Sequence, residues 1–375
     1  MMIFWSILAF VLLLTVLVIV HELGHYLAAV FSGVTVEEFG FGIPPRIKKL
    51  FRYRGTVFSL NAIPFGGFVR LQGENSFDPS ERVRAGSFAS ASIPARLLIL
   101  VAGVFMNVVI AIMLYTAGFW LWHWVPTYLS LEALEQSEQR GEVQVAWKLH
   151  ITDVVSESPA ESAGVVEGAI LLAVDAVPVK TPDDVLKIQE GKRSVRYTYL
   201  VSEEDSTSDS TSTVLVQLDE GKSGVVLSPE ATVIDGSDRS LPTGMMLALR
   251  ESWTVTVGNI QGIGLLLKSL VVAQKVPKDI AGIIGIAQLT HDSLQQGFMK
   301  YLRLVALLSL SLGVLNILPF PALDGGRMVF VLYELIARRP ANRRVEMMTN
   351  GIGILLIMVL MVAVTWNDIL RLLSA

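Results

Sequence analysis

A segment without charged residues that leads into the pentapeptide HELGH constrains this chain more than any other feature. Residues 1–20 contain no Asp, Glu, Lys or Arg, the pentapeptide occupies residues 21–25, and the apolar sequence resumes at 26–31. A helix that spans a membrane needs about 20 predominantly apolar residues, so this segment predicts one. Ionisable side chains are costly inside a membrane, and they are functional candidates where they occur.

The pattern HExxH has a specific chemical meaning on a helix. His21 and His25 would lie one turn apart on the same face, which suits two imidazole ligands of one zinc ion. Glu22 would then lie close enough to accept a proton from a water molecule at the metal. The alternatives are ordinary surface histidines or a polar cluster that joins helices. Neither explains two His and one Glu together inside an apolar segment.

The composition supports a membrane protein. The chain has 375 residues, of which 52% are hydrophobic and 17% are charged, whereas a soluble globular protein has about 25% charged residues. The net charge of −4 gives no indication of nucleic-acid binding. The chain has no Cys, which excludes disulfides and thiolate ligands. Any zinc ion must therefore be bound by His, Asp or Glu.

Four segments are apolar enough to be spanning helices, and the third of them is interrupted. They cover residues 3–31, 97–122, 301–336 and 351–364. Within the third, Asn316, Pro319, Pro321 and Asp324 break the apolar pattern. Irregular backbone at membrane depth is tolerated only where it is buried in protein or lines a cavity. The interruption is therefore a second functional candidate.

Basic clusters predict the orientation of the spans. Lys and Arg gather at 46–54, 82–96 and 338–344, and the positive-inside rule places all three on the cytoplasmic side. Four spans satisfy this with both termini outside. A fifth span at 253–276 would violate it, so we interpret that stretch as a helix on the outer face. The first and third spans then run in the same direction, which predicts that both motifs reach a similar depth.

The regions between the spans are expected to contain strands. Residues 36–73 mix aromatic, β-branched and basic residues, which indicates short strands with turns at 54–55 and 66–67. Such a sheet could hold a substrate in an extended form. The stretch from 124 to about 250 is acidic and rich in Ser and Thr, with a predicted helix at 181–189. Its predicted strands are 144–147, 169–175, 195–201, 214–218 and 224–227.

The interrupted third span supplies a carboxylate. The sequence from Asn316 to Gly326 follows the pattern NxxPxPxLDG and contains Asp324. Two His and one carboxylate leave a fourth position open for water, as a catalytic zinc site requires. Pro319 and Pro321 remove backbone donors and break the helix. The alternative is that Asp324 only caps the helical segment that follows.

Together these motifs resemble the site-2 protease family of intramembrane zinc metalloproteases, and within it the bacterial regulator-of-sigma-E protease branch. The resemblance is carried by residues 21–25, 39–42, 62–69, 281–287 and 316–326. It implies that His21, His25 and Asp324 bind one Zn²⁺ ion per chain and that Glu22 is the general base. It also implies that Asn316 holds the substrate backbone or the developing oxyanion. Residues 46–73 would be a membrane-dipping β-hairpin that clamps the substrate.

Residues 150–236 resemble a PDZ domain of the bacterial, circularly permuted type. The resemblance is carried by 154–164, Gly168 and 174–179. This sequence has Ala169 and Ala176 where that type usually has Asp and Gly, which predicts an altered turn. The length allows one such unit. It implies a possible binding site for peptide tails.

We therefore predict a polytopic α-helical membrane protein with four transmembrane helices, a membrane-associated β-hairpin or sheet, and an extramembrane β-rich PDZ-like domain. The predicted order is a first transmembrane helix with HExxH (1–35), a membrane-associated β region on the cytoplasmic side (36–92), a second transmembrane helix (93–123), an extracytoplasmic PDZ-like domain (124–250, core about 150–236), an outer-face amphipathic helix and loop (251–299), a third transmembrane helix with NxxPxPxLDG (300–337), and a cytoplasmic loop with the fourth transmembrane helix (338–375).

The predicted function is a zinc-dependent intramembrane endopeptidase that cleaves transmembrane segments of single-span proteins, such as anti-sigma factors or remnant signal peptides. It would act within the lipid bilayer of the bacterial inner membrane, with the N-terminus, the PDZ-like domain and the C-terminus extracytoplasmic. One alternative is a catalytically inactive scaffold that binds protein tails through the PDZ-like domain, although the intact Glu22 argues against it. Another is a zinc transporter, which would need several ligand sets along a polar path.

Overall fold

The computed structural model describes residues 2–74, 78–128, 131–141, 143–201, 210–219, 221–236, 239–269, 272 and 282–374. The chain forms two compact units, unit 1 (Met1–Pro126 with Arg239–Ala375) and unit 2 (Thr127–Asp238). Part of the predicted outer-face loop, and the first residue of the 281–287 motif, lie outside the described residues.

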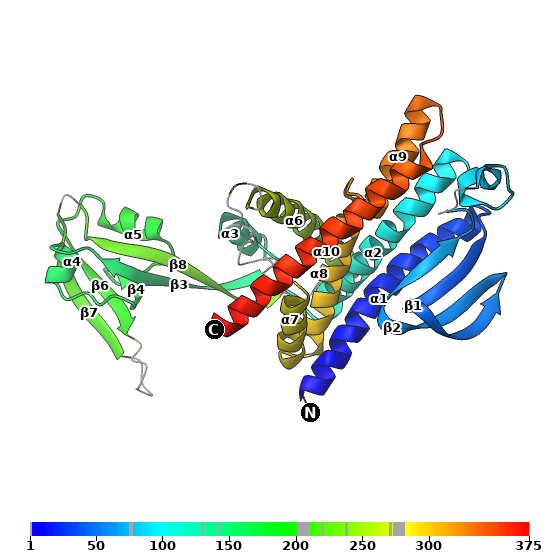
Figure 1. Ribbon diagram of the computed structural model, residues 1–375. Helices are drawn as coiled ribbons and strands as arrows, with labels where there is room; N and C mark the ends of the chain where they lie inside the picture. Colours follow the sequence, from blue (N-terminus) through cyan, green and yellow to red (C-terminus); the bar gives the residue numbers. More distant parts are fainter. Residues whose placement is uncertain are drawn as a thin grey trace. The chain divides into compact units, whose positions relative to one another are not determined.

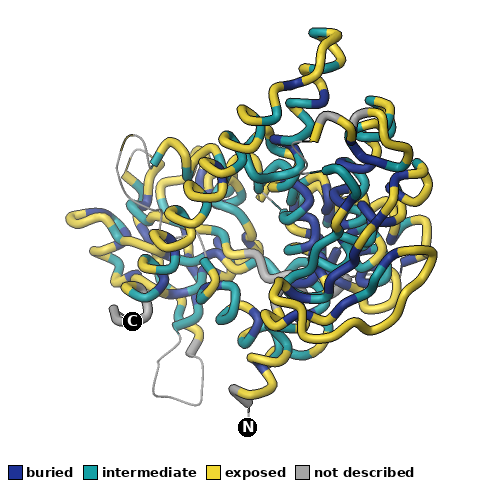
Figure 2. The backbone as a smooth tube through the Cα atoms, turned by 45° about the vertical axis from the view of Figure 1, so that its right-hand side comes forward, coloured by how far each residue is buried: buried dark blue, intermediate teal, exposed yellow. Residues whose placement is uncertain are grey.

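Among the described residues, four helices of unit 1 are long and apolar enough to cross a membrane. They are α1 (Met2–Phe31), α2 (Ile93–Leu121), α8 (Phe298–Ile317) and α10 (Arg343–Ser374). The predicted number of candidate membrane-spanning helices is confirmed. Helix α2 packs against α1 and α8 (Figure 1). Many large apolar side chains of these helices are exposed, as expected of surfaces that face lipid, and Figure 2 shows the exposed positions along the backbone.

Two further helices of unit 1 are α6 (Leu241–Lys268) and α7 (Ile283–Gln295). Residues 239–250, which we predicted to end the extramembrane domain, instead belong to unit 1, and α6 begins within them at Leu241. The physical reason is a helix start at Ser240, whose side chain accepts a hydrogen bond from the amide of Thr243. Helix α6 is not among the candidate spans.

The third predicted transmembrane segment is two helices. Helix α8 ends at Ile317 and α9 (Asp324–Ala337) begins after an irregular loop. A Cβ atom on Gly325 would lie 2.1 Å from the carbonyl oxygen of Leu318, and one on Gly326 would lie 2.3 Å from that of Phe320. Only glycine allows the chain to fold back this closely. The predicted interruption is present, and Asp324 is the first residue of the new helix.

A long hairpin follows α1. Strands β1 (Val36–Tyr53) and β2 (Thr56–Leu71) pair antiparallel around a turn at Arg54 (φ 47°) and Gly55 (φ 90°), where we predicted one. The second predicted turn, at 66–67, lies inside β2: the chain reverses between Ile63, which pairs with Ile43, and Gly67, which pairs with Phe41, and Gly66 between them has φ 82°. Gly67 is also needed for close packing of the strands, since its Cβ atom would lie 2.9 Å from the carbonyl oxygen of Gly40.

The hairpin folds back on itself beside α1. Phe39 pairs with both Val69 and Phe58, so the start of β1 lies between two parts of β2. The ring of Tyr26 on α1 packs edge-on against the rings of Phe39 and Phe58, with centroids 5.8 Å apart in each pair. This aromatic cluster holds the sheet against the helix that carries HExxH. Two short 3₁₀ helices, η1 (Pro79–Arg82) and η2 (Phe88–Ser90), lead from the hairpin to α2.

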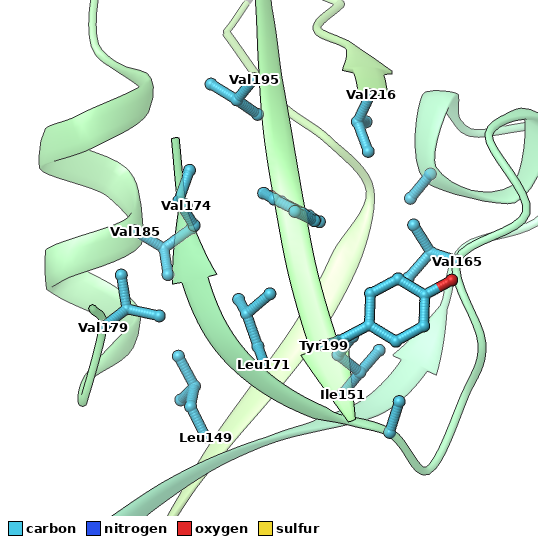
Figure 3. Close-up of a cluster of buried hydrophobic side chains, with 13 residues drawn as sticks. Leu149, Ile151, Val165, Leu171, Val174, Val179, Val185, Val195, Tyr199 and Val216 are labelled. Carbon is cyan, nitrogen blue, oxygen red and sulfur yellow. The ribbon is translucent and has the colours of Figure 1, made fainter. Parts of the chain in front are cut away.

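The described residues of unit 2 form a six-stranded sheet and three short helices. Its strands follow the order β7-β6-β4-β3-β8, and β5 pairs with β4. The predicted strands and helix of this region are confirmed. The elements are α3 (Leu131–Gln139), β3 (Val143–Val154), α4 (Pro159–Ser162), β4 (Ile170–Val174), β5 (Val177–Pro178), α5 (Pro182–Gln189), β6 (Ser194–Val201), β7 (Ser210–Gln217) and β8 (Val225–Gly236). Figure 3 shows the core, where Ile151, Leu171 and Tyr199 pack together.

The turn between β4 and β5 carries one of the two unusual alanines. Asp175 (φ 50°) and Ala176 (φ 64°) both adopt the left-handed conformation, which favours glycine. The carboxylate of Asp175 accepts hydrogen bonds from Nζ of Lys192 at 2.7 Å and from the amide of Arg196 at 2.8 Å. The hydrogen bond from Lys192, followed by that from the amide of Arg196, holds the pKa of Asp175 below its usual range. Both hydrogen bonds also fix the turn, so it forms with alanine in place of glycine.

This strained turn gives a prediction about stability. The substitution Ala176→Gly relieves the left-handed strain and is expected to stabilise unit 2 by about 1 kcal/mol. Hydrogen exchange of the amides in β4 and β6 should slow about five-fold in the full-length protein. The control Ala173→Gly changes a residue that pairs with Thr198 inside β4 and should speed exchange. Faster exchange in Ala176→Gly would contradict the account of the turn.

Candidate metal centre

Helices α1 and α2 cross at two glycines. A Cβ atom on Gly24 would lie 2.2 Å from the carbonyl oxygen of Ala102. A Cβ atom on Gly103 would lie 2.5 Å from Nε2 of His25 and 2.8 Å from Cε1 of His21. Small residues allow helix backbones to approach closely. The crossing therefore presses α2 directly against the face of α1 that carries both histidines.

Three side chains from the two predicted motifs meet at this crossing. Nε2 of His21 lies 3.0 Å from Oδ2 of Asp324, although the residues are 303 positions apart. Nε2 of His25 lies 3.3 Å from the same oxygen and 3.2 Å from Nε2 of His21. The group is largely buried and could hold a metal ion. Ligands at about 2.0–2.1 Å in a tetrahedron around zinc are about 3.3 Å apart, so these atoms fit a zinc ion.

Helix α2 supports the far side of each imidazole. Nδ1 of His25 donates to the carbonyl oxygen of Ile99 at 2.7 Å, which leaves Nε2 free of a proton for a metal. Nδ1 of His21 lies 3.3 Å from the side-chain amide of Asn107. Asn107 is fully buried, and its Oδ1 has no hydrogen-bond partner among the described residues. Rotation of this amide by half a turn would let Oδ1 accept from Nδ1 of His21 and would satisfy both groups.

Sequence patterns alone did not point to Asn107. The signal was available, because it is the only side-chain amide in 93–121, where the only charged residue is Arg96. A lone amide inside a spanning helix usually has a polar partner. A single Asn that belongs to no motif indicates no particular chemistry. Only the crossing of α2 with α1 shows that its partner is His21.

The predicted site residues share one cavity of about 450 Å³. Glu22 lines it next to the metal-ligand group, and Nδ2 of Asn316 lies 3.5 Å from Nε2 of His21. Strand β2 forms another wall, since a Cβ atom on Gly67 would lie 3.7 Å from Cγ of Glu22. All five predicted site residues are therefore brought together.

The loop that carries Asp324 is supported by α10. The amide of Ala322, at φ 75°, donates to Oδ1 of Asn350 at 3.3 Å. A Cβ atom on Gly353 would lie 2.4 Å from the Cβ atom of Pro321. The last predicted span therefore packs directly on the irregular loop and fixes the position of the carboxylate.

An ion pair lies at the wall of the cavity. Arg327 of α9 pairs with Glu74, which follows β2, and both residues line the cavity. The pair connects the hairpin region to the helix that begins with Asp324. Neither residue stood out in the sequence, because single Arg and Glu residues outside a motif carry no spacing signal.

Comparison with known proteins identifies the class. The model of peptidase family M50 matches residues 9–360. The chain is 28% identical over 422 residues to the protein named "Zinc metalloprotease RasP" of Bacillus licheniformis, covering 98% of this chain and 99% of that protein. It is 30% identical over 385 residues to "Putative zinc metalloprotease CPE1693" of Clostridium perfringens, covering 99% of each.

The chain therefore belongs to peptidase family M50, the site-2 protease family. It is a zinc metalloprotease with candidate membrane-spanning helices. The resemblance stated from the sequence and the zinc requirement are confirmed, and the inactive scaffold is not favoured. The roles of the five site residues and the PDZ-like identity of unit 2 stay predictions.

The support of His21 by Asn107 gives a prediction about metal affinity. The substitution Asn107→Leu removes the partner of the imidazole and is expected to weaken zinc binding about 10- to 100-fold. Asn107→Asp keeps an acceptor and should retain most of the affinity. Competition with a chromophoric chelator in detergent measures both.

A matched control is Asn259→Leu, which removes an amide that donates to Oγ of Ser311 at 3.1 Å. Neither Asn259 nor Ser311 lines the cavity. This variant should leave the zinc affinity unchanged. Equal zinc affinities of Asn107→Leu and the wild-type protein would show that Asn107 does not support His21.

Proposed function

We propose that this protein is an intramembrane endopeptidase that cleaves transmembrane segments of single-span proteins. The observation that carries the proposal is that the three candidate ligands and Glu22 share one cavity, and that Glu22 and both histidines lie within the candidate span Phe4–Phe31. His21, His25 and Asp324 would hold the zinc ion. A peptide bond that reaches this cavity has to come from within or directly beside the bilayer.

The chemistry follows from the side chains around the cavity. Zinc, when bound, lowers the pKa of a water ligand to about 7 and polarises a peptide carbonyl. Glu22 accepts a proton from the attacking water and delivers it to the nitrogen of the leaving amine. Asn316 donates its side-chain amide to the developing oxyanion, a contact worth about 3 kcal/mol in other hydrolases. Its place beside Nε2 of His21 supports this role.

Strand β2 is suited to present the substrate. Residues 67–71 pair on one side with the start of β1, and the described part of the sheet contains no further strand beside them. Phe68, Val69 and Arg70 line the cavity next to Glu22. A helical substrate hides its carbonyl groups in internal hydrogen bonds, so it has to unwind before cleavage. Pairing with this edge of β2 would stabilise the extended form.

The topology and the role of unit 2 complete the proposal. The basic clusters support an orientation in which residues 46–54 and 338–344 lie on the cytoplasmic side of the bacterial inner membrane. The N-terminus, unit 2 and the C-terminus would then be extracytoplasmic. Unit 2 would be a PDZ-like domain that binds peptide tails, as supported by its single sheet and the capped helix α5. Anti-sigma factors and remnant signal peptides are the substrate classes that suit this arrangement.

The role of Glu22 can be tested directly. In Glu22→Gln the proton acceptor is lost, and cleavage of a single-span substrate in detergent is expected to fall by about 10²- to 10⁴-fold. The zinc content should remain one ion per chain. The control Glu37→Gln changes an exposed carboxylate on β1 and should cleave at the wild-type rate. Full activity of Glu22→Gln would rule out Glu22 as the base.

The need for unwinding can be tested on the substrate. Two adjacent Leu→Gly substitutions beside the scissile bond lower the helix propensity by about 1.5 kcal/mol, so kcat/KM is expected to rise about 10-fold. Two Leu→Ala substitutions at the same positions preserve the helix and serve as the control. If the Gly and Ala substrates are cleaved equally fast, unwinding does not limit the reaction.

A further inference from the structure

Arginines make up four of the eight residues that line a second cavity in unit 1. It has a volume of about 340 Å³ and lies where α2 and α10 begin and α9 ends. Arg96 comes from α2, Arg338 and Arg339 from the connection after α9, and Arg343 from the start of α10. Glu334 is the only carboxylate among the residues that line it. The cavity shares no lining residue with the candidate metal centre.

Two of the four guanidinium groups have carboxylate partners. Arg96 pairs with Glu334 at 2.6 Å, and the other oxygen of Glu334 accepts a hydrogen bond from the amide of Ala341 at 2.9 Å. Arg343 pairs with Glu346 at 2.9 Å. Both carboxylates are therefore already engaged. Nε of Arg96 is buried and has no hydrogen-bond partner among the described residues.

The other two guanidinium groups leave the cavity with an excess of positive charge. Within the described part of the chain, Arg338 and Arg339 form no ion pair, and Nε of Arg339 donates only to the neutral hydroxyl of Tyr333 at 3.1 Å. Four cations therefore line a cavity that contains one carboxylate, Glu334, and a second carboxylate, Glu346, pairs with Arg343 without lining the cavity. Guanidinium groups bind phosphate oxygens through paired hydrogen bonds, so phosphate is the anion that suits this geometry.

Two helix starts add to the positive potential. Ile93 and Arg343 are the first residues of α2 and α10, and both line the cavity. The start of each helix is capped, by Oγ of Ser92 for α2 and by Oδ1 of Asn342, which accepts from the amide of Arg344, for α10. The amino-terminal ends of long helices carry partial positive charge and attract anions. Here two such ends meet the four arginines.

The place of the cavity along the spans identifies the source of the phosphate. Arg96 and Arg343 lie in the first turns of two candidate spans, which is the level of the lipid headgroups. We propose that this cavity binds the headgroup phosphate of an anionic phospholipid. Helix α10 also supports the Asp324 loop through Asn350, so the lipid would hold the connection between α9 and α10 in place.

The test uses the full-length protein in dodecyl maltoside and native mass spectrometry. Short-chain phosphatidylglycerol is expected to bind about 10-fold more tightly than phosphatidylcholine of the same chain length. The double variant Arg338→Gln/Arg339→Gln should lose this preference and keep its zinc ion. Arg338→Lys/Arg339→Lys retains the charge and should keep most of the preference, which also shows that the connection tolerates substitution.

The matched control is Arg193→Gln/Arg196→Gln, which removes two exposed charges from unit 2 and should not change lipid binding. Equal binding of the two lipids by the wild-type protein would overturn the proposal, as would a preference that survives in Arg338→Gln/Arg339→Gln. Displacement of phosphatidylglycerol by millimolar inorganic phosphate would show that free phosphate is the ligand and would also overturn the proposal. The experiment does not depend on proteolytic activity.

Discussion

Ionisable side chains inside an apolar helix have to be satisfied by neighbouring segments, because hydrocarbon offers no hydrogen bonds. The turn of α1 that carries His21, Glu22 and His25 imposes this condition on the rest of unit 1. Helix α2 supplies the hydrogen-bond partners of both imidazoles, which are the carbonyl group of Ile99 for His25 and the side-chain amide of Asn107 for His21. These contacts need a very close crossing, which Gly24 and Gly103 permit and any larger residue would prevent.

The metal centre also requires a carboxylate at the same depth in the membrane as the two histidines. This requirement explains the break between α8 and α9. A continuous helix would carry Asp324 about two turns beyond Ile317, whereas the irregular loop folds it back onto both histidines. Gly325 and Gly326 make that fold possible because a Cβ atom on either would meet backbone. Helix α10 then holds the loop through Asn350, so a helix far from α1 in sequence also serves the site.

The sequence was most informative where residue type and spacing both mattered. The i, i+4 spacing of His21 and His25, and the Pro-rich break before Asp324, predicted the centre because few other structures explain them in apolar segments. The start of α6 was missed although Ser240 and Pro242 signal a helix start. At 66–67 the Gly-Gly pair provides both a change of direction within β2 and a close approach of strands, and the sequence indicated only the first. Asn107 and Arg327 act through contacts between distant segments, which no local pattern records.

The central claim is that one zinc ion is bound by two imidazoles and one carboxylate inside the membrane-spanning unit. Zinc K-edge X-ray absorption spectroscopy of the purified protein tests it most directly. We expect four nitrogen or oxygen ligands at about 2.0–2.1 Å from the zinc ion. The multiple-scattering signal should correspond to two imidazole ligands in the wild-type protein and to one in His25→Ala. Zinc with three or more imidazoles, or a protein that binds no zinc, would contradict the account.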